Sequence, residues 1–323
     1  MNTGWAARGC ILGGALGDAL GAPVEFMSWD SIAAQYGPAG IQSPPDPALI
    51  TDDTQMTLFT AEGILLAEEE ADPVPAIRRA YLRWLRTQQE RFPGQEAVSG
   101  EEGTLLRVQT LWSPRAPGLT CLSALRAGGN GTPESPVNHS KGCGGIMRAA
   151  PAGLCFEPGK AFEVGVCAAA LTHGHPSGYL PAGCLAYLVA GLRTGRPLRD
   201  VLPGCLEELN RHPAAKETQD AIRAALSLAE DSSATPGPKT VERLGGAWVG
   251  EEALAIALYA ALIYENDPVA ALRLAVNHSG DSDSTGAITG NLLGAQQGPR
   301  VFPADWLARL EARQVMEELA DRF

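Results

Sequence analysis

Two stretches of this sequence place glycines four residues apart among small and apolar residues. The first carries Gly13, Gly17 and Gly21, and the second carries Gly286, Gly290 and Gly294. Residues at this spacing share one face of a helix, where each glycine costs about 1 kcal/mol against alanine. Glycines on a helix face allow a neighbouring backbone to come very close. We therefore expect two buried helices that pack closely against each other.

The rest of the sequence predicts a succession of helices. Apolar residues recur at helical spacing, and almost no stretch alternates as a strand does. The predicted helices cover residues 5–21, 56–70, 73–90, 160–171, 178–193, 198–210, 215–230, 250–264, 267–276, 286–297 and 304–320, with short ones near 103–111 and 120–127. No obvious linker separates them. The sequence predicts an all-α fold, with residues 1–323 in one compact domain.

The charge balance argues against two kinds of partner. The 323 residues include 37 acidic and 25 basic ones, a net charge of −12. Nucleic acid and anionic membranes need clustered Lys and Arg, so neither is an expected partner. Seven scattered cysteines without a C-x-x-C pair indicate reduced thiols, and no apolar run reaches membrane-spanning length. We expect a cytoplasmic protein.

Two acidic clusters form the candidate site. They are Thr51-Asp52-Asp53-Thr54 and Asp281-Ser282-Asp283-Ser284, each just before a predicted helix. If the two helix starts meet, four carboxylates converge and need cations between them, and such hard ligands suit Mg²⁺, Mn²⁺ or Ca²⁺. The alternative for either cluster is helix capping, which favours the same residue types. A calcium-hand loop is rejected because its twelfth position is Leu292 instead of glutamate.

Three further positions bear on this site. Glu25 follows the first glycine-rich helix among apolar residues, and a buried carboxylate of this kind needs either an arginine or the metal site as partner. The glycine-rich end of the loop at 140–145 allows backbone N–H groups to face a phosphate, although it fits neither a P-loop nor a dinucleotide fingerprint. His173 and His175 are candidates for metal ligation, or for capping and hydrogen bonding to a ligand.

Five ordered motifs extend from about residue 8 to 297. They are Gly17-Asp18-Ala19-Leu20-Gly21-x-x-x-Glu25, Thr51-Asp52-Asp53-Thr54, Gly144-Gly145-x-Met147-Arg148-x-x-Pro151, Thr172-His173 and Gly280-Asp281-x-Asp283-Ser284-x-Gly286-Ala287. Together they resemble the ADP-ribosylglycohydrolase family, which includes the dinitrogenase-reductase-activating glycohydrolases and the ADP-ribosylhydrolases.

The resemblance implies an all-α fold with a binuclear Mg²⁺ or Mn²⁺ centre. Such an enzyme cleaves ADP-ribose from an ADP-ribosylated protein or a small ADP-ribose conjugate. The implied metal ligands are Thr51, Asp52, Asp53, Asp281, Asp283 and Ser284, with Thr285 as an alternative hydroxyl to Ser284. The implied catalytic residues are Glu25 and Asp53. The implied substrate-binding residues are Ser140, Gly142, Gly144, Gly145, Met147 and His173.

One segment departs from the arginine-specific relatives. They carry a Phe-Asp-Ile-Gly segment whose Asp acts in catalysis, whereas the aligned stretch here, Arg115-Ala116-Pro117-Gly118-Leu119-Thr120, has no carboxylate. Arginine-linked and O-linked ADP-ribose therefore both stay open as substrates.

Two other functions are alternatives. One is a non-catalytic ADP-ribose-binding protein of the same fold, although all the metal-binding acids are present. The other is an all-α Mg²⁺-dependent isoprenoid synthase, which needs Asp-Asp-x-x-Asp on a helix, whereas Asp52 and Asp53 have no third Asp at that spacing.

Overall fold

The computed structural model describes residues 3–67, 72–95, 98 and 103–323. Within these ranges the α-helices are α1 (Thr3–Gly21), α2 (Trp29–Tyr36), α3 (Asp52–Ala67), α4 (Val74–Gln89), α5 (Leu119–Arg126), α6 (Ala150–Cys155), α7 (Pro158–Ala170), α8 (Pro176–Leu192), α9 (Leu198–Leu209), α10 (Lys216–Glu230), α11 (Pro238–Val241), α12 (Gly250–Ile263), α13 (Pro268–Val276), α14 (Ser282–Gln297), α15 (Ala304–Arg309) and α16 (Arg313–Ala320). Short 3-10 turns are η3 (Leu105–Arg107), η4 (Gln109–Trp112), η5 (Cys143–Gly145), η6 (Glu242–Leu244) and η7 (Pro299–Val301). Only two isolated β-bridges occur in the described ranges, Ala48 with Leu310 and Gly142 with Val249. The predicted all-α fold is confirmed.

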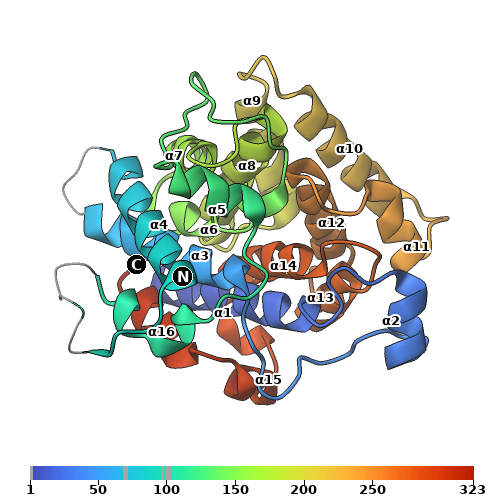
Figure 1. Ribbon diagram of the computed structural model, residues 1–323. Helices are drawn as coiled ribbons and strands as arrows, with labels where there is room; N and C mark the ends of the chain where they lie inside the picture. The colour runs from blue at the N-terminus through green and yellow to red at the C-terminus, as the bar shows by residue number, and fades with distance from the viewer. Residues whose placement is uncertain (1–2, 68–71, 96–97, 99–102) are drawn as a thin grey trace.

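Helices α1 and α14 lie side by side in the centre of the molecule (Figure 1). A Cβ atom added at Gly17 would lie 2.0 Å from the carbonyl oxygen of Gly286, and one at Gly290 would lie 1.9 Å from that of Gly13. Both distances are far below van der Waals contact, so the two backbones touch along their glycine faces. The expected close packing is confirmed, and it brings the end of α1 beside the start of α14.

The other helices pack around this pair. α3 packs on α4, α7 on α8 and α10 on α12, while α8, α12 and α13 also contact α14. α3 further contacts α1 and α14, which places its first turn close to the start of α14. The end of α1 and the start of α3 therefore meet the start of α14, which lies more than 200 residues further along the chain.

Several elements differ from the predicted helices. α3 and α14 each begin four residues earlier than predicted, at Asp52 and Ser282, so the acidic clusters form the first turns. The predicted helix 304–320 is two helices, because the chain turns at Ala312, which has a left-handed φ of 54°, and Glu311 N donates to Ala48 O (3.0 Å). The short helices α2, α6 and α11 were not predicted. The predicted end of helix 56–70 lies partly outside the described residues.

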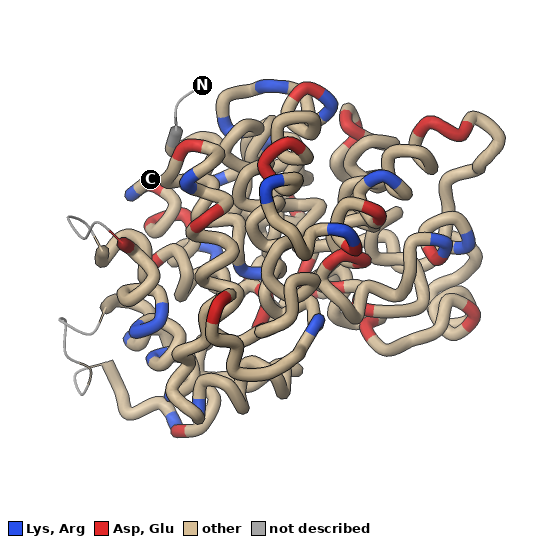
Figure 2. The backbone as a smooth tube through the Cα atoms, turned by 90° about the horizontal axis from the view of Figure 1, so that it is seen from above, with Lys and Arg blue, Asp and Glu red and all other residues tan. Residues whose placement is uncertain are grey.

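Acidic and basic residues are interspersed along the chain (Figure 2). None of the helices in the described ranges is both long enough and apolar enough to span a membrane.

Candidate active site

Asp18 organises the start of α3. This buried carboxylate accepts hydrogen bonds from the backbone N–H groups of Thr51 (3.0 Å) and Thr54 (3.2 Å), and from the hydroxyl groups of both threonines. A negative charge at a helix N-terminus is stabilised by the unpaired N–H groups and the helix dipole. Asp18 on the neighbouring helix therefore caps α3, which leaves Asp52 and Asp53 available for other contacts.

In the first cluster, Thr51 contributes a cap, because its Oγ1 accepts from Asp53 N (3.3 Å). The two carboxylates make other contacts: Asp52 Oδ2 accepts from Gly118 N (3.1 Å), and Asp53 Oδ2 is buried without a hydrogen-bond partner. The Gln55 side chain accepts from Trp84 Nε1 (3.1 Å) and donates to Ser113 O (3.0 Å). In the second cluster Asp281 does cap α14, accepting from Ser284 N (3.3 Å).

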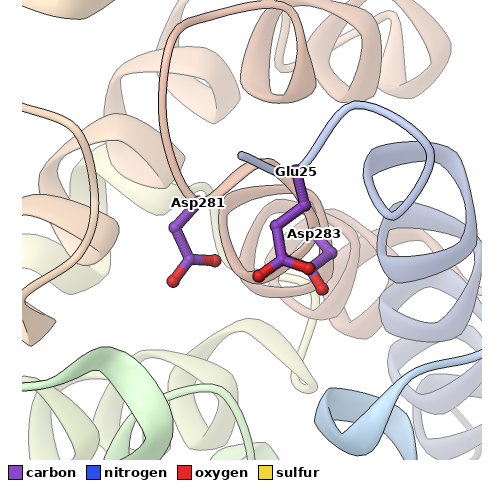
Figure 3. A group of neighbouring side chains, drawn as sticks. All are labelled: Glu25, Asp281 and Asp283. Carbon is purple, nitrogen blue, oxygen red and sulfur yellow. The ribbon is translucent and has the colours of Figure 1, made fainter. Parts of the chain in front are cut away.

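Glu25 faces the second cluster. It lies in the turn after α1, and its carboxylate points toward Asp281 and Asp283 at the start of α14 (Figure 3). One carboxylate oxygen of each of these residues lies within 4.8 Å of the others. Of the two expected partners for Glu25, an arginine or the acidic site, the structure shows the acidic site.

A cavity of about 550 Å³ opens over these acids. Its lining includes ten of the residues singled out from the sequence: Glu25, Asp52, Asp53, Gly142, Gly144, Met147, His173, Asp281, Asp283 and Ser284. Three others lie just behind the wall. The Thr51 hydroxyl donates to Asp18 and lies 3.3 Å from Asp283 Oδ2. Ser140 Oγ accepts from Gly142 N (3.2 Å). The backbone of Gly145 packs against Gly178.

The hydroxyl groups of Ser284 and Thr285 have different surroundings. Ser284 lines the cavity, whereas Thr285 Oγ1 donates to Ala275 O (2.7 Å) and contacts His278 Nε2 (3.1 Å) inside the protein. Between the two, Ser284 is the hydroxyl that faces the acids.

The acids strongly affect one another's ionisation. Burial raises the pKa of Asp52 to about 8, and burial together with the charges of Asp281 and Asp52 raises the pKa of Glu25 to about 8. Burial likewise raises the pKa values of Asp53 and Asp283 well above the usual range. Carboxyl groups with pKa values this high retain their protons at neutral pH unless a bound cation replaces the protons.

The residues present fit a divalent metal centre. The cavity lining contains five carboxylates and no Lys or Arg. The unpartnered, buried Asp53 Oδ2 needs either a proton donor or a cation. Carboxylate and hydroxyl oxygens are the donors that Mg²⁺ and Mn²⁺ prefer, so the oxygen-rich set agrees with the ligands expected from the sequence.

The glycine-rich loop forms the opposite wall, and buried Arg148 holds it in place. Arg148 Nη1 donates to Gly144 O (2.5 Å), and Nη2 donates to Thr172 Oγ1 (2.7 Å). The first N–H groups of the turn η5 have no partner within the turn, and Gly142, Cys143 and Gly144 line the cavity. This arrangement suits an anionic group such as a phosphate.

His173 contributes a neutral imidazole beside this loop. Burial and the Arg148 charge lower the pKa of His173 to about 3, so the imidazole is uncharged. Nδ1 lies 2.8 Å from Thr172 Oγ1, which accepts from Arg148. Nε2 lies on the side of Gly142 and Gly144. His175 does not reach the cavity lining; it caps α8 by accepting from Ser177 N (3.1 Å).

Several cavity residues were not predicted as site residues from the sequence. Phe26 and Trp248 stack with ring centroids 5.4 Å apart, and both are exposed at the cavity, as is Leu119. The sequence held no signal for Trp248, because it ends a long Ser/Pro/Gly loop. Cys143 also lines the cavity, and its place within the glycine-rich motif was the only available signal.

The fold is shared with a known structure. The chain matches the solved structure of an ADP-ribosylglycohydrolase-related protein complex with a TM-score of 0.70 and 27% identity, over 99% of this chain and 97% of that one. The all-helical chain therefore shares the fold of that protein and carries an acid-lined cavity. The profile of the ADP-ribosylglycohydrolase family matches residues 5–323, so the chain belongs to that family.

Two characterised relatives are similar over nearly the whole chain. One is the ADP-ribosyl-dinitrogen reductase glycohydrolase of Rhodospirillum rubrum, 29% identical over 95% of this chain and 90% of the relative. The other is the ADP-ribosylarginine hydrolase Tri1 of Serratia proteamaculans, 24% identical over 98% of this chain and 78% of the relative. Membership of this family sets the isoprenoid-synthase alternative aside.

Proposed function

We propose that this protein is a metal-dependent hydrolase that cleaves the glycosidic bond between ADP-ribose and its acceptor. The observation that carries the proposal is the buried, unpartnered Asp53 Oδ2 in a cavity that joins five carboxylates to a glycine-rich loop. The names of the relatives support release of ADP-ribose from an ADP-ribosylated protein, and a small ADP-ribose conjugate would suit the same cavity.

The proposed metal ligands are Thr51, Asp52, Asp53, Asp281, Asp283 and Ser284. Two Mg²⁺ or Mn²⁺ ions held there would supply positive charge that orients the ribose hydroxyls and activates water. Asp18 contributes indirectly, because its hydrogen bonds fix the first turn of α3, from which Asp52 and Asp53 project.

The remaining roles belong to side chains around the acids. Glu25, which is half-buried and lies at the edge of the acidic group, takes a proton from the attacking water or passes one to the leaving group. The loop at Gly142–Gly145 binds the diphosphate, and His173 Nε2 forms a hydrogen bond with the ligand beside it. Met147 contributes apolar surface to the same wall.

The acceptor linkage follows from the segment that lacks a carboxylate. Residues 116–120 line the cavity, and Gly118 N donates to Asp52, so this segment lies against the acidic site. Every acid in the cavity lining already belongs to the proposed metal and catalytic set, which leaves none to pair with a guanidinium. We therefore favour a neutral, hydroxyl-linked acceptor such as ADP-ribosyl-serine over ADP-ribosyl-arginine.

The test is release of free ADP-ribose from matched ADP-ribosyl-serine and ADP-ribosyl-arginine peptides, each with Mg²⁺, with Mn²⁺ and with chelator. We expect metal-dependent release from the serine peptide, and loss of both metal and release in Asp53→Ala. Release from the arginine peptide alone overturns the proposed linkage but not the reaction. Binding of ADP-ribose without release from either peptide favours the non-catalytic alternative.

A further inference from the structure

Arg148 is a fully buried guanidinium without a counter-charge. It is 0% exposed, and no carboxylate lies within ion-pair distance of it in the part of the chain that the structure describes. Its Nε has no hydrogen-bond partner. The other contacts are all to uncharged groups: Gly144 O (2.5 Å), Cys121 Sγ (3.2 Å), Met56 Sδ (3.6 Å), Thr172 Oγ1 (2.7 Å), Ala168 O (3.3 Å) and the ring of Tyr81. A buried cation without an anionic partner is strongly destabilising, so this charge indicates a ligand that offsets it.

The guanidinium lies directly behind the glycine-rich loop. It donates to the carbonyl oxygen of Gly144, a residue that lines the cavity. The peptide bond after Gly144 is trans, so its N–H points away from Arg148. A cation at the carbonyl end of a peptide polarises that peptide and strengthens its N–H as a donor to anions. The charge also acts at the cavity wall, because burial and the Arg148 charge together lower the pKa of His173, which lines the cavity.

The cavity itself offers little positive charge to an anionic ligand. Five carboxylates and no Lys or Arg line it, and two divalent ions would not outweigh five carboxylates. Lys141 belongs to the glycine-rich loop, but its Nζ is paired with Glu217 Oε2 (2.7 Å) and neither residue lines the cavity. Arg148 is therefore the cation in contact with this loop that has no anion of its own.

We propose that Arg148 supplies the positive charge with which the glycine-rich loop attracts the diphosphate of the ligand, and that it acts from behind the loop as a positioning residue that does not touch the ligand. The inference rests on the proposed function, in which this loop binds the diphosphate of ADP-ribose. Because the charge acts through the protein interior, where screening by water and salt is weak, it contributes more than an exposed arginine would. The site consequently selects ligands with an anionic linker over neutral glycosides.

The test is calorimetric binding of ADP-ribose to the full-length, Mg²⁺-loaded protein. Arg148→Lys keeps a positive charge and Arg148→Gln does not, while both keep a donor for Gly144 O. We expect Arg148→Gln to weaken ADP-ribose binding by about tenfold or more, and Arg148→Lys by about threefold or less. If Arg148 only held the loop in place through hydrogen bonds, the two variants would lose affinity alike. Elemental analysis and circular dichroism check that metal content and fold are unchanged.

Met56→Glu is a second test that leaves Arg148 in place. Met56 is buried in α3, does not line the cavity, and has its Sδ 3.6 Å from Arg148 Nη1. A carboxylate there would pair with the guanidinium, so we expect Met56→Glu to weaken ADP-ribose binding by about tenfold or more, and its matched control Met56→Gln by about threefold or less. Equal losses in Arg148→Lys and Arg148→Gln, or unchanged binding in Met56→Glu, overturn this proposal and leave the hydrolase standing. No binding of ADP-ribose by the Mg²⁺-loaded wild type overturns the proposed function itself.

Discussion

Gly290→Ala tests the helix packing on which the site depends. The added Cβ would lie 1.9 Å from the carbonyl oxygen of Gly13, whereas real Cβ atoms keep at least 3.0 Å from such neighbours. The obstructing atom belongs to the backbone, so no side-chain rotation relieves the clash, and α1 and α14 must separate by about 1 Å. Overpacking of this kind costs about 3 kcal/mol of unfolding free energy, at the upper end of the usual range.

The assay is thermal unfolding of the metal-free protein, with metal binding measured by calorimetry. A loss of about 3 kcal/mol lowers Tm by roughly 6 °C in a chain of this size. Metal affinity should fall as well, because α14 carries Asp281 and Asp283 at its start. The matched control is Gly159→Ala in α7, where an added Cβ meets nothing within 4 Å, and its Tm should be unchanged or slightly higher. A Gly290→Ala Tm within about 1 °C of the wild type would refute the packing argument.

Three further predictions concern the acids. Asp18→Asn removes the charge that caps α3. It should lower the free energy of unfolding, measured with denaturant, by about 2 kcal/mol and should weaken metal binding. A metal affinity equal to that of the wild type contradicts the capping role. The pKa of Asp52 is raised to about 8, so the folded metal-free protein binds more protons than the unfolded chain. The Tm of the metal-free protein should therefore fall as pH rises from about 4 to 8. A Tm that rises over this range contradicts the assignment. Glu25→Gln should retain bound metal but lose about 100-fold or more in the rate of ADP-ribose release, and full activity would remove Glu25 from the mechanism.

Features that depend on regular local spacing could be predicted from the sequence. The glycine faces of α1 and α14 follow from a four-residue repeat, and their contact explains why two acidic clusters more than 200 residues apart belong to one site. Most of the residues singled out from motifs line the cavity, because the motifs stand at helix ends or in the turns beside them.

Features that depend on tertiary contacts could not be predicted in this way. The carboxylate that accepts from the first N–H groups of α3 belongs to Asp18, more than 30 residues away on another helix, which local rules cannot predict. The break at Ala312 follows the residues that pair with Ala48, Arg309 to Glu311, and the stack of Phe26 on Trp248 joins two loops without any shared pattern. The difference between Ser284 and Thr285 likewise depends on which hydroxyl faces α13.

The central claim is that the acids at the starts of α3 and α14 hold metal ions. The most direct test is elemental analysis after dialysis against Mn²⁺ and removal of free ion, on the wild type and on Asp53→Ala and Asp283→Ala. The account predicts two ions per chain in the wild type and a loss of bound ion in either variant, with circular dichroism unchanged. Equal metal content in all three proteins, or none in the wild type, would contradict it.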